Sequence, residues 1–200
     1  MSDQIARALA GPAPEARDAA RRFADRAAAE HAADLAYAVL PSPVGELLLV
    51  GGARGLVRLH YLDGTLERAL EPLARTRSPR IVASRAALAP WERELDEYFA
   101  GRRERFDAPL DWAQMAPFQR RILRATAAIP YGSTSTYGGV ATQAGNPGAQ
   151  RAAGTALGHN PLAIVVPCHR VLRSGGAVGG YTGGLERKRF LLALEGALLL

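Results

Sequence analysis

The residues best suited to chemistry surround the single cysteine of the chain. Cys168 is followed directly by His169 and preceded by a short apolar run. A thiol is a weak nucleophile until it loses its proton, and an adjacent imidazole can accept that proton directly or through one water molecule. The imidazole in turn needs an acid to fix its tautomer. Glu186 lies in a charged run, whereas Glu195 follows an apolar helical run, so Cys168, His169 and Glu195 form a candidate relay.

A lone cysteine also limits what else the chain can do. One thiol cannot form an intramolecular disulfide, and it cannot build a cysteine cluster for a metal. We therefore expect no metal and no cofactor. A small buried apolar side chain is the commoner role for such a cysteine, and taken by themselves the residues leave both roles open.

The positive charge is concentrated at one end of the chain. Residues 112–200 carry nine basic side chains and two acidic ones, whereas residues 36–111 are neutral and residues 1–35 have one excess acid. A basic module of this kind is typical of proteins that bind a polyanion such as DNA. A solvated basic surface is the alternative.

The patterns of residues predict a mixed α and β chain. In the basic half, two short helices over 136–142 and 149–158 flank a turn at 145–148, as in a helix-turn-helix, although simple packing in a bundle is the alternative. The other predicted helices cover 1–35 (with a break near 11–14), 64–75, 91–99, 117–128 and 185–194; the predicted strands cover 37–40, 47–50, 56–61, 81–82 and, as a buried strand-like run, 162–166; the linker covers 102–112.

The sequence also favours a location for the protein. No apolar run reaches the roughly 18 residues that a membrane-spanning helix needs, and the N-terminus has no apolar segment of a secretory signal. We therefore expect a soluble, cytoplasmic protein that does not bind membranes.

The chemistry-bearing segment resembles a known family, the O6-alkylguanine-DNA alkyltransferases. The most specific motif is Pro167-Cys168-His169-Arg170-Val171, with Asn160-Pro161 eight residues before the cysteine. The resemblance covers about residues 36–197. Further matching segments are Tyr98-Phe99-Ala100-Gly101, Ile129-Pro130-Tyr131-Gly132, Thr136-Tyr137, Gly145-Asn146-Pro147, Tyr181-Thr182-Gly183-Gly184-Leu185 with Lys188, and Leu191-Leu192 with Glu195-Gly196.

The resemblance implies an α+β fold with two domains. Residues 36–108 would form a small N-terminal ribonuclease H-like β-sheet domain. Residues 112–200 would form a mostly α-helical DNA-binding alkyltransferase domain, whose helix-turn-helix docks in the DNA minor groove. Residues 1–35, an Ala- and Arg-rich helical extension, fall outside the resemblance.

The resemblance also implies direct-reversal DNA repair. An alkyl group would pass irreversibly, once per molecule, from O6-alkylguanine (and from O4-alkylthymine) in flipped-out DNA to Cys168. His169 would act as the water-linked base, Glu195 as its partner and Asn160 as a support for Cys168. Tyr137 would protonate the leaving guanine. The residues expected to contact DNA or the flipped base are Arg151 (filling the gap in the base stack), Tyr181 (a lid), Val171, Val178 and Thr182 (the pocket wall) and Gly154 (close approach of the recognition helix).

The expected partner is double-stranded DNA that contains O6-alkylguanine, bound by a monomer; cooperative binding along DNA is left open. One alternative is a non-catalytic protein that binds alkylated DNA without transfer, but such relatives replace the acceptor cysteine and this chain keeps Cys168. The other alternative is a cysteine hydrolase, for which the sequence marks no oxyanion hole. Some relatives carry zinc or a cysteine-rich sensor domain, and Cys168 alone could build neither.

Overall fold

A computed structural model describes residues 14–29 and 33–197 of the 200-residue chain. Its N-terminal part is built on a four-stranded sheet of β1 (Leu35–Leu40), β2 (Leu47–Gly52), β3 (Gly55–Tyr61) and β4 (Ile81–Ala83), in the order β3-β2-β1-β4. The first three strands form an antiparallel meander, and β4 lies parallel to β1.

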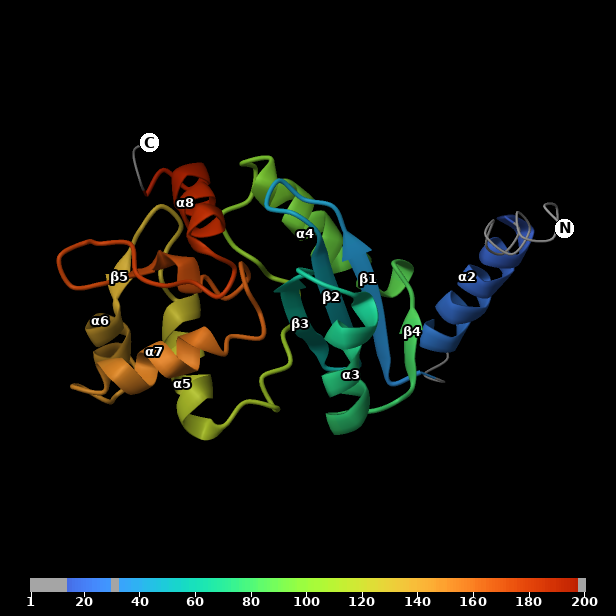
Figure 1. Ribbon diagram of the computed structural model, residues 1–200, viewed down its shortest axis with the longest axis horizontal. Helices are drawn as coiled ribbons and strands as arrows, with labels where there is room; N and C mark the ends of the chain where they lie inside the picture. The colour runs from blue at the N-terminus through green and yellow to red at the C-terminus, as the bar shows by residue number, and fades with distance from the viewer. Residues whose placement is uncertain (1–13, 30–32, 198–200) are drawn as a thin grey trace, which may run out of the picture.

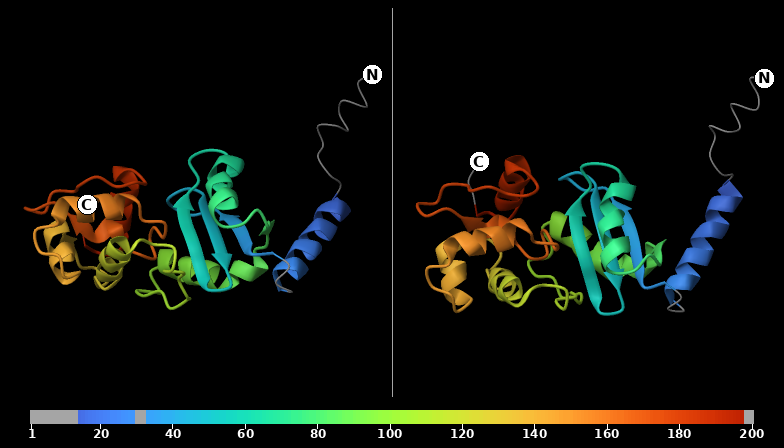
Figure 2. Two further views of the ribbon diagram at one scale, coloured as in Figure 1. Left: turned by 90° about the horizontal axis from the view of Figure 1, so that it is seen from below. Right: turned by 60° about the horizontal axis from the view of Figure 1, so that its bottom comes forward.

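The sheet buries apolar residues on both faces. Leu48 and Val50 of β2 pack in a cluster with Leu73 of α3 (Leu66–Thr76), whereas Leu47 and Leu49 pack in the cluster that holds Leu95 of α4 (Ala89–Phe99). Successive side chains of a strand point to opposite faces, so α3 and α4 cover opposite sides of the sheet (Figures 1 and 2). A short 3-10 helix, η1 (Ala86–Leu88), precedes α4.

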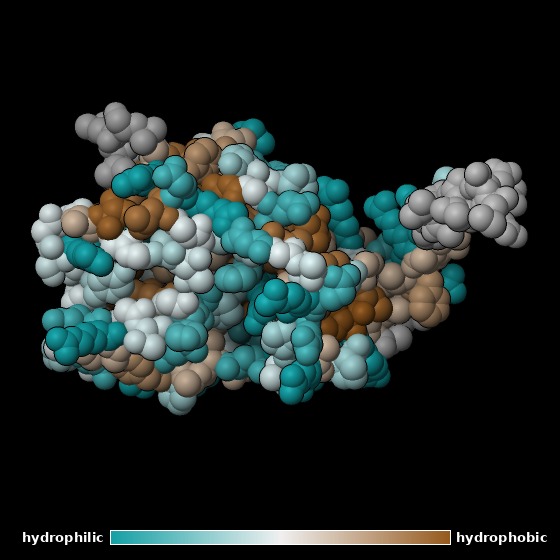
Figure 3. Space-filling view, viewed as in Figure 1, coloured by the Kyte–Doolittle hydropathy of each residue, from teal (hydrophilic) through white to brown (hydrophobic). Residues whose placement is uncertain are grey.

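The N-terminal extension forms α2 (Pro14–Ala29), within the helix predicted over 1–35, and residues 1–13 and 30–32 lie outside the described residues. The prediction is wrong at its end, because residues 33–34 form a bend and Leu35 begins β1. Ser84 donates a 2.6 Å hydrogen bond to Asp25 of α2, which holds α2 beside the β4 edge, away from α7 (Figure 1). Ala20 and Ala24 line a hollow of about 440 Å³ together with Val39, and Figure 3 shows an apolar area between α2 and the sheet.

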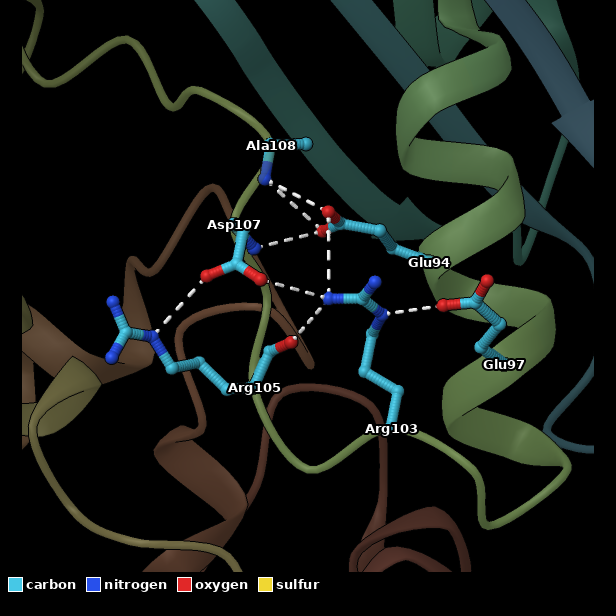
Figure 4. A network of polar contacts seen from close by, with 6 residues as sticks. All are labelled: Glu94, Glu97, Arg103, Arg105, Asp107 and Ala108. Atoms are coloured by element: carbon cyan, nitrogen blue, oxygen red, sulfur yellow. Dashed lines mark hydrogen bonds and ion pairs between the residues drawn. The ribbon is translucent and has the colours of Figure 1, made fainter.

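A polar network fastens the segment that leaves α4 (Figure 4). The buried carboxylate of Glu94 accepts hydrogen bonds from the backbone N–H groups of Asp107, at 3.0 Å, and Ala108, at 3.1 Å. Arg103 pairs with Glu97 at 2.7 Å and with the Asp107 carboxylate at 3.1 Å. The predicted linker is therefore held firmly against α4.

The C-terminal part is mostly helical. Its elements are α5 (Pro117–Ala127), β5 (Ser135–Thr136), α6 (Tyr137–Gln143), α7 (Gln150–Gly158), the 3-10 helix η2 (Cys168–Arg170), β6 (Val171–Leu172) and α8 (Leu185–Leu194). A turn over 144–149 joins α6 to α7, and both helices pack on α5. This turn contains Gly145 and Gly148 at φ of 76° and 84°, a backbone conformation that favours glycine.

The predicted strand over 162–166 is wrong. The segment is buried, but it is a turn: the N–H of Val166 donates to the carbonyl of Leu162 at 2.8 Å, and Ile164 has a φ of 70°. Only an isolated bridge joins Leu162 to Leu59 of β3. The Asn160 side chain explains the difference, because it binds both Leu162 and Val166 and takes backbone groups that a strand would use.

The two parts share one hydrophobic core. The cluster around α4 continues through Ile122 of α5 and Val140 of α6 to Val171 and Leu191. The sheet and the helical part therefore pack as neighbours, and the domain limits at 108 and 112 stay a prediction. In the part of the chain that the structure describes, no helix is long and apolar enough to cross a membrane. Among the same residues, no group of three or more His, Cys, Asp or Glu side chains is placed to hold a metal ion.

Candidate active site

Cys168 opens η2 at the floor of a cavity of about 720 Å³. Its side chain is almost buried, with 9% of the residue exposed. The cavity lies between α6, α7 and the loop that follows β6. We call residues 175–184 of this loop the Gly-rich loop. Its lining residues are Tyr137, Gly138, Gln150, Arg151, Gly154, Leu157, Gly158, Cys168, Arg173, Ser174, Gly180, Tyr181 and Thr182.

Asn160 supports the cysteine directly. Its amide nitrogen donates to the carbonyl of Val166 at 2.9 Å and to the sulfur of Cys168 at 3.2 Å. Its amide oxygen accepts from the N–H of Leu162 at 3.0 Å. The side chain therefore shapes the turn that delivers Cys168 and offers the sulfur a hydrogen-bond donor.

His169 is fully buried and hydrogen-bonded to Glu195. The His169 Nε2 and Glu195 Oε1 atoms are 2.8 Å apart, while His169 Nδ1 has no hydrogen-bond partner among the described residues. Burial lowers the pKa of His169 below its ordinary 6.5, although the Glu195 hydrogen bond opposes this. The imidazole is therefore neutral near pH 7, with Nε2–H donating to Glu195 and Nδ1 able to accept a proton.

Glu195 is a buried carboxylate with three donors. Besides His169, it accepts the hydroxyl of Tyr98 at 2.7 Å and both Nε and Nη2 of Arg170, at 2.8 and 3.0 Å. Burial alone raises the pKa of the Glu195 carboxyl, but the hydrogen bonds from His169 and Arg170 outweigh it and lower that pKa to about 2. Glu195 therefore stays ionised and fixes the His169 tautomer, whereas the Glu186 side chain is exposed to solvent.

Burial raises the pKa of the Cys168 thiol, while Asn160 and the nearby charge of Lys188 lower it. Lys188 is itself buried, and its ammonium donates to the carbonyls of Val171 at 2.6 Å and Gly179 at 3.4 Å. Burial lowers the pKa of Lys188 to about 8. The resting sulfur is therefore a protonated thiol surrounded by groups that stabilise its anion once the proton leaves.

Two tyrosines face the cavity. The hydroxyl of Tyr137 lies 3.5 Å from the carbonyl of Gly180, and burial raises the Tyr137 pKa, so this phenol keeps its proton at neutral pH. Tyr181 lies in the Gly-rich loop with its ring edge-to-face against His169 and its hydroxyl 2.7 Å from that of Tyr61. Burial likewise raises the Tyr181 pKa.

The cavity brings together some of the other predicted residues. Arg151 is exposed on α7, and Gly154 lies on the same helix with the Tyr137 ring beside its backbone. Thr182 donates to the carbonyl of Gly158 at 2.9 Å. Val171 is fully buried and Val178 half-buried, and neither is among the residues that line this cavity. Their predicted place in the pocket wall stays a prediction.

Sequence reasoning assigned no role to several residues of the site. Arg170 and Lys188 stand in the matched motifs, so the motif itself was the available signal. Tyr98, on α4, also stands in a matched segment, whereas Tyr61, on β3, stands in none; both lie more than 60 residues from Cys168 along the chain. Only the packing of the sheet against the helical part brings them in.

Family models match both parts of the chain. Residues 117–197 match the model described as 6-O-methylguanine DNA methyltransferase, DNA binding domain, and residues 35–112 match 6-O-methylguanine DNA methyltransferase, ribonuclease-like domain. These matches confirm the predicted α+β class with an N-terminal ribonuclease-like domain.

Individual relatives agree with the family models. A methylated-DNA–protein-cysteine methyltransferase of Mycolicibacterium paratuberculosis is 47% identical over 159 residues, covering 80% of this chain and 91% of that protein. The crystal structure of Mycobacterium tuberculosis O6-methylguanine methyltransferase has a TM-score of 0.70 and 41% identity, covering 82% of this chain and 93% of that one. The structure described as Mycobacterium tuberculosis OGT in complex with DNA has the same TM-score and 42% identity, covering 81% of this chain and 93% of that one. Family models match both domains, and the cysteine lies in a hydrogen-bonded site. The chain therefore belongs to the 6-O-methylguanine DNA methyltransferase family.

Proposed function

We propose that this protein repairs O6-alkylguanine in DNA by moving the alkyl group irreversibly to the sulfur of Cys168. The observation that carries the proposal is that Cys168 lines a cavity and is hydrogen-bonded to Asn160, while its neighbour His169 is paired with Glu195. The relatives are named as methylated-DNA–protein-cysteine methyltransferases, which is a transfer of the same kind.

The transfer begins with removal of the thiol proton. His169 Nδ1, the ring nitrogen with no partner among the described residues, accepts it through one water molecule. The imidazolium that forms is stabilised by the Glu195 carboxylate. The thiolate is stabilised by the Asn160 amide and the Lys188 charge, which act at the moment when negative charge appears on sulfur.

The bond exchange is an in-line displacement at the alkyl carbon. A carbon–sulfur bond forms, the bond from that carbon to guanine O6 breaks, and its electron pair stays on guanine. Tyr137 holds a phenolic proton at the cavity and donates it to a ring nitrogen of the leaving guanine, which would otherwise leave as an anion. The thioether is not reversed, so each molecule acts once.

The lesion reaches Cys168 only outside the base stack, because the sulfur lies at the floor of a cavity. We propose that α7 docks in the minor groove of double-stranded DNA, that exposed Arg151 fills the vacated gap, and that Tyr181 covers the flipped base. Gly154 would let the helix approach the sugar-phosphate backbone. The basic surplus of residues 112–200 favours this docking.

We propose that the same transfer to Cys168 also repairs O4-alkylthymine. We propose that the protein works as a monomer in the cytoplasm, where it would meet the genome. A lesion-binding protein without transfer is not favoured, because such a protein has no need of a thiol next to a histidine that is paired with a buried acid.

A stoichiometry assay tests the proposal. An excess of duplex DNA with one O6-methylguanine is mixed with increasing amounts of protein, and restored guanine is counted when the reaction stops. We expect the final amount of restored guanine to equal the amount of protein added. Cys168→Ser should bind the duplex but restore nothing. Continued turnover would point to a hydrolase, and binding without restoration would point to a lesion sensor.

A further inference from the structure

The end of β3 reaches across to the Gly-rich loop over the active site. The hydroxyls of Tyr61 and Tyr181 are 2.7 Å apart, and their rings meet edge-to-face with centroids 6.0 Å apart. Tyr61 is buried, with 4% of the residue exposed. A hydroxyl pair removed from water makes a directional contact, so Tyr61 limits where the Tyr181 ring can lie.

The loop passes directly against the Tyr61 ring. A Cβ atom added at Gly183 would lie 2.2 Å from a ring carbon of Tyr61 and 2.9 Å from one of Tyr181. Real Cβ atoms do not approach that closely, so only glycine allows the loop to pass here. The contact between the domains therefore involves loop backbone as well as side chains.

Arg187 of α8 also packs on the Tyr61 ring. Its guanidinium carbon lies 4.4 Å from the centroid of the Tyr61 ring, and its Nη2 pairs with Asp63 at 2.6 Å. Its Nε donates to the carbonyl of Val44 at 2.8 Å, and its Nη1 donates to the carbonyl of Gly183 at 3.2 Å. One side chain of the helical domain thus connects the sheet domain to the loop.

We propose that Tyr61 is a positioning residue for the transfer reaction, through which the N-terminal domain holds Tyr181 in place over Cys168. This inference rests on the proposed function, in which Tyr181 covers the flipped base. If Tyr181 is held in place before DNA binds, no conformational entropy is lost in ordering it during the reaction. The contact with Tyr61 therefore raises the transfer rate, although Tyr61 does not touch the reacting atoms. It also assigns a role to the ribonuclease-like domain in the chemistry of its neighbour.

A double-mutant cycle on the full chain tests the contact. The variants are Tyr61→Phe, Tyr181→Phe and the double variant, each of which keeps the ring and removes one hydroxyl. Tyr37→Phe on β1 is the matched control, because Tyr37 packs on the α3 side of the sheet. The readouts are the rate of methyl transfer from duplex DNA, the rate of Cys168 reaction with iodoacetamide, and the unfolding midpoint.

We expect each single variant to lose about fivefold in transfer rate, the size of one net hydrogen bond, and the double variant to lose no more than either. The same variants should react faster with iodoacetamide, again without additivity, because a loosened lid exposes the thiol. Tyr37→Phe should leave both rates unchanged.

Two results would overturn the inference. Additive losses, about twenty-five-fold in the double variant, would mean that the hydroxyls act independently. Unchanged transfer and iodoacetamide rates in Tyr61→Phe would make Tyr61 a packing residue only. If the wild type transfers no methyl group but the iodoacetamide cycle is coupled, the proposed function fails while the positioning of Tyr181 by Tyr61 stands.

Discussion

Replacing Glu195 by Gln tests whether Glu195 acts on His169 and Arg170 as a buried charged partner. The substitution keeps the size of the side chain and removes its charge. Arg170 would then be a buried guanidinium without its carboxylate, and His169 would lose the acceptor that fixes its tautomer. Both stability and transfer should therefore fall.

The structure sets the size of the loss in stability. A Glu195 pKa lowered from 4.5 to about 2 corresponds to about 3 kcal/mol of folding free energy at neutral pH. That agrees with the cost of about 3 to 5 kcal/mol for removing one partner of a buried ion pair. For transfer we expect a loss of about a hundredfold or more, the usual contribution of a positioned general base.

The pH dependence has a definite sign. Because the folded pKa of Glu195 lies below the unfolded one, its contribution is present above about pH 4.5 and is lost as pH falls toward 2. The difference in stability between the wild type and Glu195→Gln should thus shrink below pH 4.5. His169 adds to the loss in acid, because its lowered folded pKa makes protonation favour the unfolded state below pH 6.5.

Urea unfolding from pH 3 to 8, with single-turnover repair at pH 7, provides the assay. Glu186→Gln is the matched control, since Glu186 lies on the same helix with a side chain 95% exposed, and its loss should cost less than about 0.5 kcal/mol. A Glu195→Gln protein as stable as the Glu186→Gln control at pH 7, or one that repairs at the wild-type rate, would mean that Glu195 neither stabilises the buried pair nor acts on His169.

Three further substitutions probe the rest of the site. Asn160→Ala should destabilise the protein by about 1 to 3 kcal/mol, because the Leu162 N–H and the Val166 carbonyl lose a buried partner, and should slow transfer; unchanged urea unfolding would contradict this. Lys188→Met should raise the pKa of Cys168, seen as a shift of the iodoacetamide rate profile to higher pH, and an unmoved profile would exclude an electrostatic role. Arg151→Ala should slow repair of duplex DNA more than of single-stranded DNA, since only the duplex has a gap to fill; equal losses would make Arg151 a phosphate contact.

Local patterns predicted much of the fold. Alternating and apolar runs located β1, β2 and β3, and the turn at 145–148 located the α6–α7 pair. The segment after Asn160 was mistaken for a strand because an apolar run does not reveal that one side chain holds its backbone in a turn. The apolar run over 162–166 predicts burial of the segment, and the segment is buried.

The site was predictable where its residues lie close along the chain or in motifs. Cys168 and His169 are adjacent, and Glu195 could be chosen over Glu186 from its apolar flank. Tyr98 lies in a matched segment and Tyr61 in none, but the contacts of both depend on how the sheet and α4 pack against Glu195 and the Gly-rich loop. That packing is a property of the folded chain and leaves no local signal.

The most direct test of the account is the mass of the intact protein after mixing with duplex DNA that contains one O6-methylguanine, followed by peptide mapping. We predict a gain of one methyl group per molecule, located on Cys168, with guanine restored in the DNA. Tight binding with no change in mass, or a methyl group on any other residue, would contradict it.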